Sequence, residues 1–162
     1  MTRARKEWWA SVAVRRDEHL IKLLKANMPW CDFEQAIRAQ EKELMREART
    51  PAERLHIQRL SMPVLITEAY ARRLKWAEFG PLLRRCQRLG FADMTHRIEV
   101  ACCFVQALPG FPEKAPRAFA ELTSVEQALK RIRKSHYLRR EGMASIVHAR
   151  NVAEAAGLKW ER

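Results

Sequence analysis

The chain has 162 residues, and 31 Lys and Arg against 19 Asp and Glu give it a formal net charge of +12. Hydrophobic residues make up 48% of the chain, with only five Gly and seven Pro, which excludes a disordered polyelectrolyte, a collagen-like chain and a Pro-rich linker. A chain of this length can bury one good core or two small ones.

The first half of the chain has the apolar spacing of helices. Apolar residues recur every three to four positions over residues 3–26, and Pro29 ends that run. Residues 32–49 follow as a second helix. Thr50 and Glu53 form a capping box that predicts a helix to about residue 60. We expect Pro63 and the pair Gly80-Pro81 to interrupt the chain next, which gives two further helices over residues 64–78 and 82–89.

The most apolar segment is the predicted helix 94–108, which Asp93 caps. Apolar residues occupy most of its circumference, and a helix of that kind is surrounded by other helices. We therefore expect it to be the centre of the fold.

Residues 109–116 are rich in Pro and Gly and predict a linker. Helices are expected beyond it near residues 117–122, 125–139 and 143–156. The sequence thus predicts an all-α fold, a multi-helix bundle of six to eight helices around helix 94–108. Residues 1–108 would form the helical core and residues 117–162 a basic helical C-terminal unit packed on it, together one compact domain.

The strongest local signal of function is a basic segment over residues 130–140, which contains no acidic residue. On the predicted helix 125–139 these cations share one face, which can follow a phosphate backbone, and His136 or Tyr137 could stack on a base. The candidate nucleic-acid-binding residues are Lys130, Arg131, Arg133, Lys134, Arg139 and Arg140. The same face could instead bind an acidic protein.

The last helix offers Arg150 and Asn151, residue types that read base edges in the major groove. A three-helix unit ending in such a helix is compatible with a helix-turn-helix arrangement, although the turn chemistry around Gly142 does not favour it.

Two adjacent tryptophans near the N-terminus are the candidate partner-binding residues. Trp8 and Trp9 would point about 100° apart on a helix, so both cannot face one core. An exposed Trp is typical of a protein-interaction hot spot. The alternative is that both belong to a wide buried stripe.

No pattern predicts catalysis, a cofactor or a metal. The four cysteines show no Cys-x-x-Cys pair, which predicts reduced thiols in a cytoplasmic protein. His96, Glu99 and Cys103 share one helix face but lack predicted further ligands. Arg131 and His136 have the spacing of the Arg and His in helical ribonucleases of the HEPN class. Chance gives such matches in a chain with 22 Arg and five His, and a Cys nucleophile with a His base stays open.

The sequence therefore favours a non-catalytic binding protein whose partner is nucleic acid. The alternative is a protein-interaction module, such as an adaptor, an inhibitor or a toxin-neutralising immunity protein, with an acidic protein as its partner. We expect no catalytic residue, no metal, no cofactor and no transmembrane segment, and the oligomeric state stays open.

Overall fold

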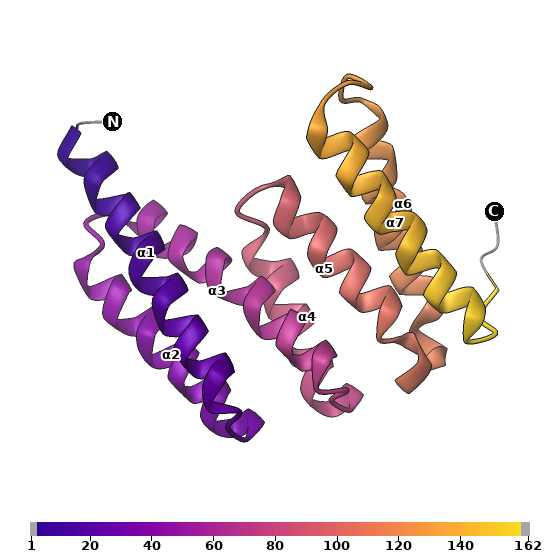
Figure 1. The fold of residues 1–162 in the computed structure, drawn as a ribbon, viewed down its shortest axis with the longest axis horizontal. Coiled ribbons are helices and arrows are strands. Elements are labelled where there is room, and N and C mark those ends of the chain that lie inside the picture. The colour runs from indigo at the N-terminus through magenta and orange to yellow at the C-terminus, as the bar shows by residue number, and fades with distance from the viewer. Residues whose placement is uncertain (1–2, 160–162) are drawn as a thin grey trace. The chain divides into compact units, whose positions relative to one another are not determined.

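The computed structural model describes residues 3–159, with side chains from Arg5 onward, and these residues are helical almost throughout (Figure 1). No strand is present within that range, so the predicted all-α class is confirmed, as is the predicted number of helices. The helices are α1 (Arg3–Ala26), α2 (Trp30–Glu47), α3 (Pro51–Ala71), α4 (Trp76–Leu89), α5 (Met94–Gln106), α6 (Ala115–Lys130) and α7 (Tyr137–Ala155). Two single turns of 3₁₀ helix, η1 (Leu108–Gly110) and η2 (Pro112–Lys114), join α5 to α6.

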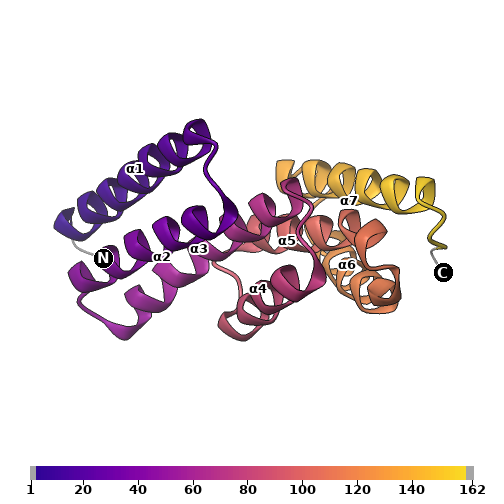
Figure 2. The same cartoon turned by 90° about the horizontal axis from the view of Figure 1, so that it is seen from below.

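The chain divides into two compact units, one up to Ser61 and one from Met62, and the division falls inside α3. In the first unit α1 and α2 form an antiparallel pair (Figure 2). Its core is a cluster of Val12, Leu44, Ala48 and Ile57, against which Trp8, Trp9 and Met45 pack. The capping box at the start of α3 forms as predicted, because Glu53 N–H donates to Thr50 Oγ1 at 3.2 Å and Thr50 N–H donates to a carboxylate oxygen of Glu53 at 3.1 Å.

Glu41 is the buried carboxyl group of the first unit, with only 4% of its surface exposed. Burial raises its pKa above the ordinary 4.5, although Arg38 and a hydrogen bond with Ser61 act in the opposite direction. The pKa of this carboxyl group is therefore higher in the folded than in the unfolded protein. The free energy of unfolding then falls as pH rises from 4.5 through the pKa of the folded state, because the folded protein must bury a charged group.

We therefore expect Glu41→Gln to be more stable than the wild type at pH 7.5, since the amide has the same shape and carries no charge. The difference should be close to zero at pH 4, where the wild-type carboxyl is largely protonated. Urea unfolding of both proteins at the two pH values measures it. A wild type that is the more stable at pH 7.5 would show that attraction to Arg38 outweighs the cost of burial.

The second unit is built around α5, which packs against α6 and α7 and is buried on most sides. Asp93 caps it as predicted, because its carboxylate accepts from His96 N–H at 2.9 Å. The core beside α5 is aromatic: Trp76, Phe79, Phe104 and Phe111 have neighbouring ring centroids 5.0–6.4 Å apart. The predicted central role of helix 94–108 is thus observed within this unit.

Two predicted helix breaks are wrong. Pro63 lies inside α3 and Pro81 inside α4. A proline in a helix removes one backbone hydrogen bond, and packing outweighs that cost here. Met62 and Leu65, which flank Pro63, are fully buried. At Gly80 a Cβ atom would lie 2.9 Å from the ring of Trp76, so glycine is required for that ring to cover the helix.

The predicted linker 109–116 lies inside the second unit. It forms η1, η2 and the first residues of α6, and Phe111 is buried at 4% exposure.

The helices that follow also differ from the prediction. The predicted helices 117–122 and 125–139 are replaced by the single helix α6, which ends at Lys130, and α7 begins at Tyr137.

Candidate nucleic-acid interface

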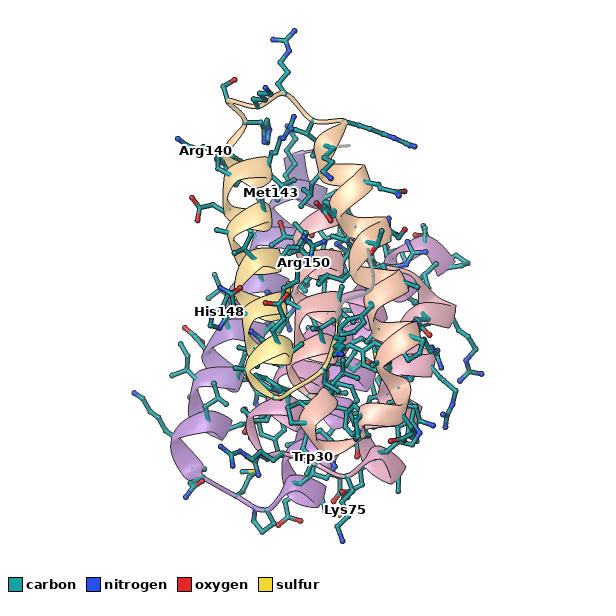
Figure 3. All side chains as sticks on the ribbon, turned by 90° about the vertical axis from the view of Figure 1, so that its right-hand side faces the viewer. Trp30, Lys75, Arg140, Met143, His148 and Arg150 are labelled. Carbon is teal, nitrogen blue, oxygen red and sulfur yellow. The ribbon has the colours of Figure 1, made fainter. Side chains whose placement is uncertain are left out.

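The basic segment forms the end of a helical hairpin and is not a helix face as predicted. Residues 130–140, here called the basic tip, comprise the last residue of α6, a loop over residues 131–136 and the first turn of α7. Figure 3 shows the loop at the top of the antiparallel pair α6 and α7, with its side chains fanning outward and Arg140 at the same end. The cations are therefore divided between a helix end, a loop and a helix start, and they do not share one helix face.

The structure divides the six predicted cations into two groups. Arg131, Arg133, Lys134 and Arg140 are exposed, and no described carboxylate lies within ion-pair distance of them. The remaining two, Lys130 and Arg139, make contacts within the hairpin.

Arg139 caps the end of α6. One of its guanidinium nitrogens donates to the carbonyl oxygens of Lys130 at 3.1 Å and Ile132 at 2.7 Å. Helix ends leave carbonyl groups without backbone partners, and a cation there also interacts favourably with the helix dipole. The side chain is half-buried as a result. Arg139 therefore holds the loop in shape and is a poor candidate for a phosphate contact.

Lys130 is paired with Glu126, whose carboxylate lies 2.8 Å from its ammonium group. Arg150 of α7 pairs with the other oxygen of the same carboxylate. Hydrogen bonds from Lys130 and Arg150 hold the pKa of Glu126 below its ordinary value. Arg150 therefore connects α7 to α6. It was predicted to read base edges, but in the structure its guanidinium group is paired with Glu126.

An aromatic pair stands beside the unpaired cations of the basic tip. Tyr137 is 64% exposed, and the ring of His136 lies parallel to it with centroids 5.0 Å apart. His136 also accepts a hydrogen bond from Leu138 N–H through Nδ1 at 3.2 Å, which fixes the ring at the start of α7. Exposed rings next to cations form the kind of surface on which unpaired bases stack.

The other predicted residues lie elsewhere. Trp8 and Trp9 are both half-buried, with ring centroids 4.5 Å apart, and Trp9 contacts the ring of His56 at 4.9 Å. Arg5 covers Trp8 with its guanidinium 3.6 Å from the ring centroid. Both tryptophans thus contribute to packing in the first unit.

The buried thiols are poor nucleophiles. Burial raises the pKa of Cys86 and Cys102 to about 12 and that of Cys103 to about 11, and only Cys31 is exposed. A thiol with such a pKa is neutral near pH 7, and the thiolate is the reactive form.

Between residues 3 and 159 no group of three or more His, Cys, Asp or Glu is placed to hold a metal ion. None of the helices described there is long and apolar enough to span a membrane.

A groove that was not predicted from the sequence lies between α5 and α7, with a volume of about 580 Å³. The only local signal for it is Gly142, which sits inside a helix. A Cβ atom there would lie 2.7 Å from Leu129 and 2.9 Å from Ile98, so glycine lets α7 approach α5 and α6 closely. The groove itself needs residues that are far apart in sequence, which no local pattern reveals.

No protein-family model matches the chain, and no curated protein and no solved structure matches it significantly.

Proposed function

We propose that the protein binds nucleic acid through phosphate contacts made by the basic tip. The observation that carries the proposal is the group of four exposed cations without described carboxylate partners, Arg131, Arg133, Lys134 and Arg140, beside the exposed ring of Tyr137. A cation that is paired with a carboxylate must give up that ion pair to bind a phosphate, which lowers the net binding free energy. These four cations lose only water and counterions when they bind a phosphate.

The helix ends favour the same partner. The first turn of α7 contains no acidic residue, and its backbone N–H groups give that end a positive potential. The opposing negative end of α6 is capped by Arg139. The start of α7 and the exposed cations therefore make the potential at the basic tip positive, and Arg139 offsets the negative end of α6. A positive potential attracts a polyanion.

Salt dependence of binding tests the proposal. A labelled single strand should bind with a log–log salt slope of about −0.7 per phosphate contact, and four contacts should give roughly −3. Fluorescence anisotropy between low and physiological salt measures the slope. No binding at low salt would contradict the proposal, and a slope near zero would exclude phosphate contacts as its basis.

An acidic protein partner is the second candidate, and one observation favours it. Val14, Ile21 and Leu24 are exposed on one face of α1, with exposed fractions of 55%, 51% and 47%. Lys22 and Lys25 are exposed close to them. An apolar strip with basic neighbours suits an acidic partner with apolar anchors. A partner that stays bound after nuclease treatment would favour this candidate, whereas release by nuclease favours nucleic acid.

A further inference from the structure

We infer that the groove between α5 and α7 holds one unpaired base of a single-stranded nucleic acid whose phosphates contact the basic tip. This inference rests on the proposed function and names the form of nucleic acid that the site takes.

The groove and the basic tip are continuous. Tyr137 and Leu138 line the groove and belong to the basic tip, so a strand lying on the cations has its next base at the groove. Tyr137 is 64% exposed, which leaves its ring accessible for stacking. Base–aromatic stacking is common in proteins that bind single strands and tolerates any base.

The groove is large enough to admit a flat heterocycle, and its lining is partly apolar. Its volume of about 580 Å³ falls in the range of small-ligand sites, which is about 300–1,000 Å³. Ile98, Cys102 and Ala144 give it apolar surface, and polar side chains also line it. Bases in a duplex are stacked and paired, so they cannot enter a concave site of this kind unless they are extruded.

The polar groups of the groove favour a base over a phosphate. Glu99 and Glu141 line it, and the carboxylate of Glu99 is oriented by a hydrogen bond from Thr67 Oγ1 at 2.8 Å. Carboxylates accept from the exocyclic amino groups of bases, as in contacts to the N4 amino group of cytosine, and they repel phosphate. Gln106 and His148 add further hydrogen-bonding groups. The charges thus separate along the site, with the phosphates at the basic tip and an amino-bearing base in the groove.

Filling the groove tests the inference. Ala144 is exposed on α7 and lines the groove, whereas Ala155 is exposed on the same helix and does not line it. We expect Ala144→Trp to weaken binding of a labelled DNA strand of alternating cytosine and adenine by about tenfold, the loss of one stacked base. The wild type should bind that strand more tightly than the same strand annealed to its complement. Ala155→Trp should bind like the wild type.

The outcomes separate the inference from the proposed function. Single-strand binding by Ala144→Trp at wild-type affinity would overturn the groove as the base site and leave the phosphate contacts in place. An equal loss in both Trp variants would also overturn it, since the effect would not belong to the groove. A wild type that binds neither strand nor duplex would overturn both. If Ala144→Trp keeps the wild-type affinity for nucleic acid but loses a protein that stays bound to the wild type, the groove is a protein-docking surface instead. Circular dichroism and the unfolding midpoint of each variant confirm that it is folded.

Discussion

Reversing Arg131, Arg133 and Lys134 to Glu is expected to abolish binding of nucleic acid. These three side chains are exposed in the loop of the basic tip and form no ion pair with a described carboxylate. Loss of one hydrogen-bonded cation–phosphate contact weakens binding about tenfold, so three losses amount to roughly 1,000-fold before the added repulsion is counted. Any residual binding measured at low salt should have a shallower salt slope than that of the wild type, because fewer counterions are released.

The variant leaves the hairpin intact, because Arg139 still caps α6 and Lys130 and Arg150 still pair with Glu126. The matched control reverses Lys75, Arg84 and Arg88, three exposed cations at or near α4 in the same unit. Both variants lower the formal net charge from +12 to +6, so only the location of the reversed charges differs between them. Anisotropy titrations should show wild-type-like binding for the control apart from a modest general loss. An equal loss in both would show that net charge, and not the basic tip, attracts the ligand.

Phe104→Ala is expected to lower the stability of the second unit by about 3–5 kcal/mol. Phe104 has no exposed surface, and its ring lies 6.0 Å from that of Trp76 and 6.3 Å from that of Phe79 by centroid distance. Its removal costs both the transfer free energy of the ring and the cavity that the neighbouring aromatic rings cannot close.

Urea unfolding followed by circular dichroism measures the loss, and Phe104→Leu is the control. Leucine fills part of the space, so the loss should be clearly smaller than for alanine. Equal stability of Phe104→Ala and the wild type would show that the aromatic cluster does not form the core of this unit.

Much of the fold follows from local sequence signals. The capping box of Thr50 and Glu53, the cap by Asp93 and the apolar circumference of α5 all depend on residues close together in the chain, and each was predicted. Proline was misleading for a physical reason. The cost of a proline inside a helix, including one lost backbone hydrogen bond, decides the outcome when the helix is exposed to solvent. The segment around Pro63 is buried, and its packing, which no local pattern reveals, outweighs that cost.

The candidate site was predicted in composition but not in shape. The sequence identified the six cations, yet it placed the five up to Arg139 on one helix face because Val125, Leu129 and Ile132 form an apolar stripe on the opposite face. The chain turns at residue 131, and the turn is held by Arg139, whose acceptor carbonyls lie seven and nine residues earlier. The partner of Arg150 is 24 residues away at Glu126. Contacts of this range decide which cations are available to a ligand.

Pro63 has a further meaning for the way the chain can be divided. It is the second residue after the boundary between the two units, so it sits in mid-helix in the intact chain, where its missing N–H costs a hydrogen bond. In a shorter polypeptide that starts at Met62, the same proline would occupy the first turn of α3, where no backbone donor is needed and its fixed φ suits the helix. The residue that weakens α3 from within would then act as its natural beginning.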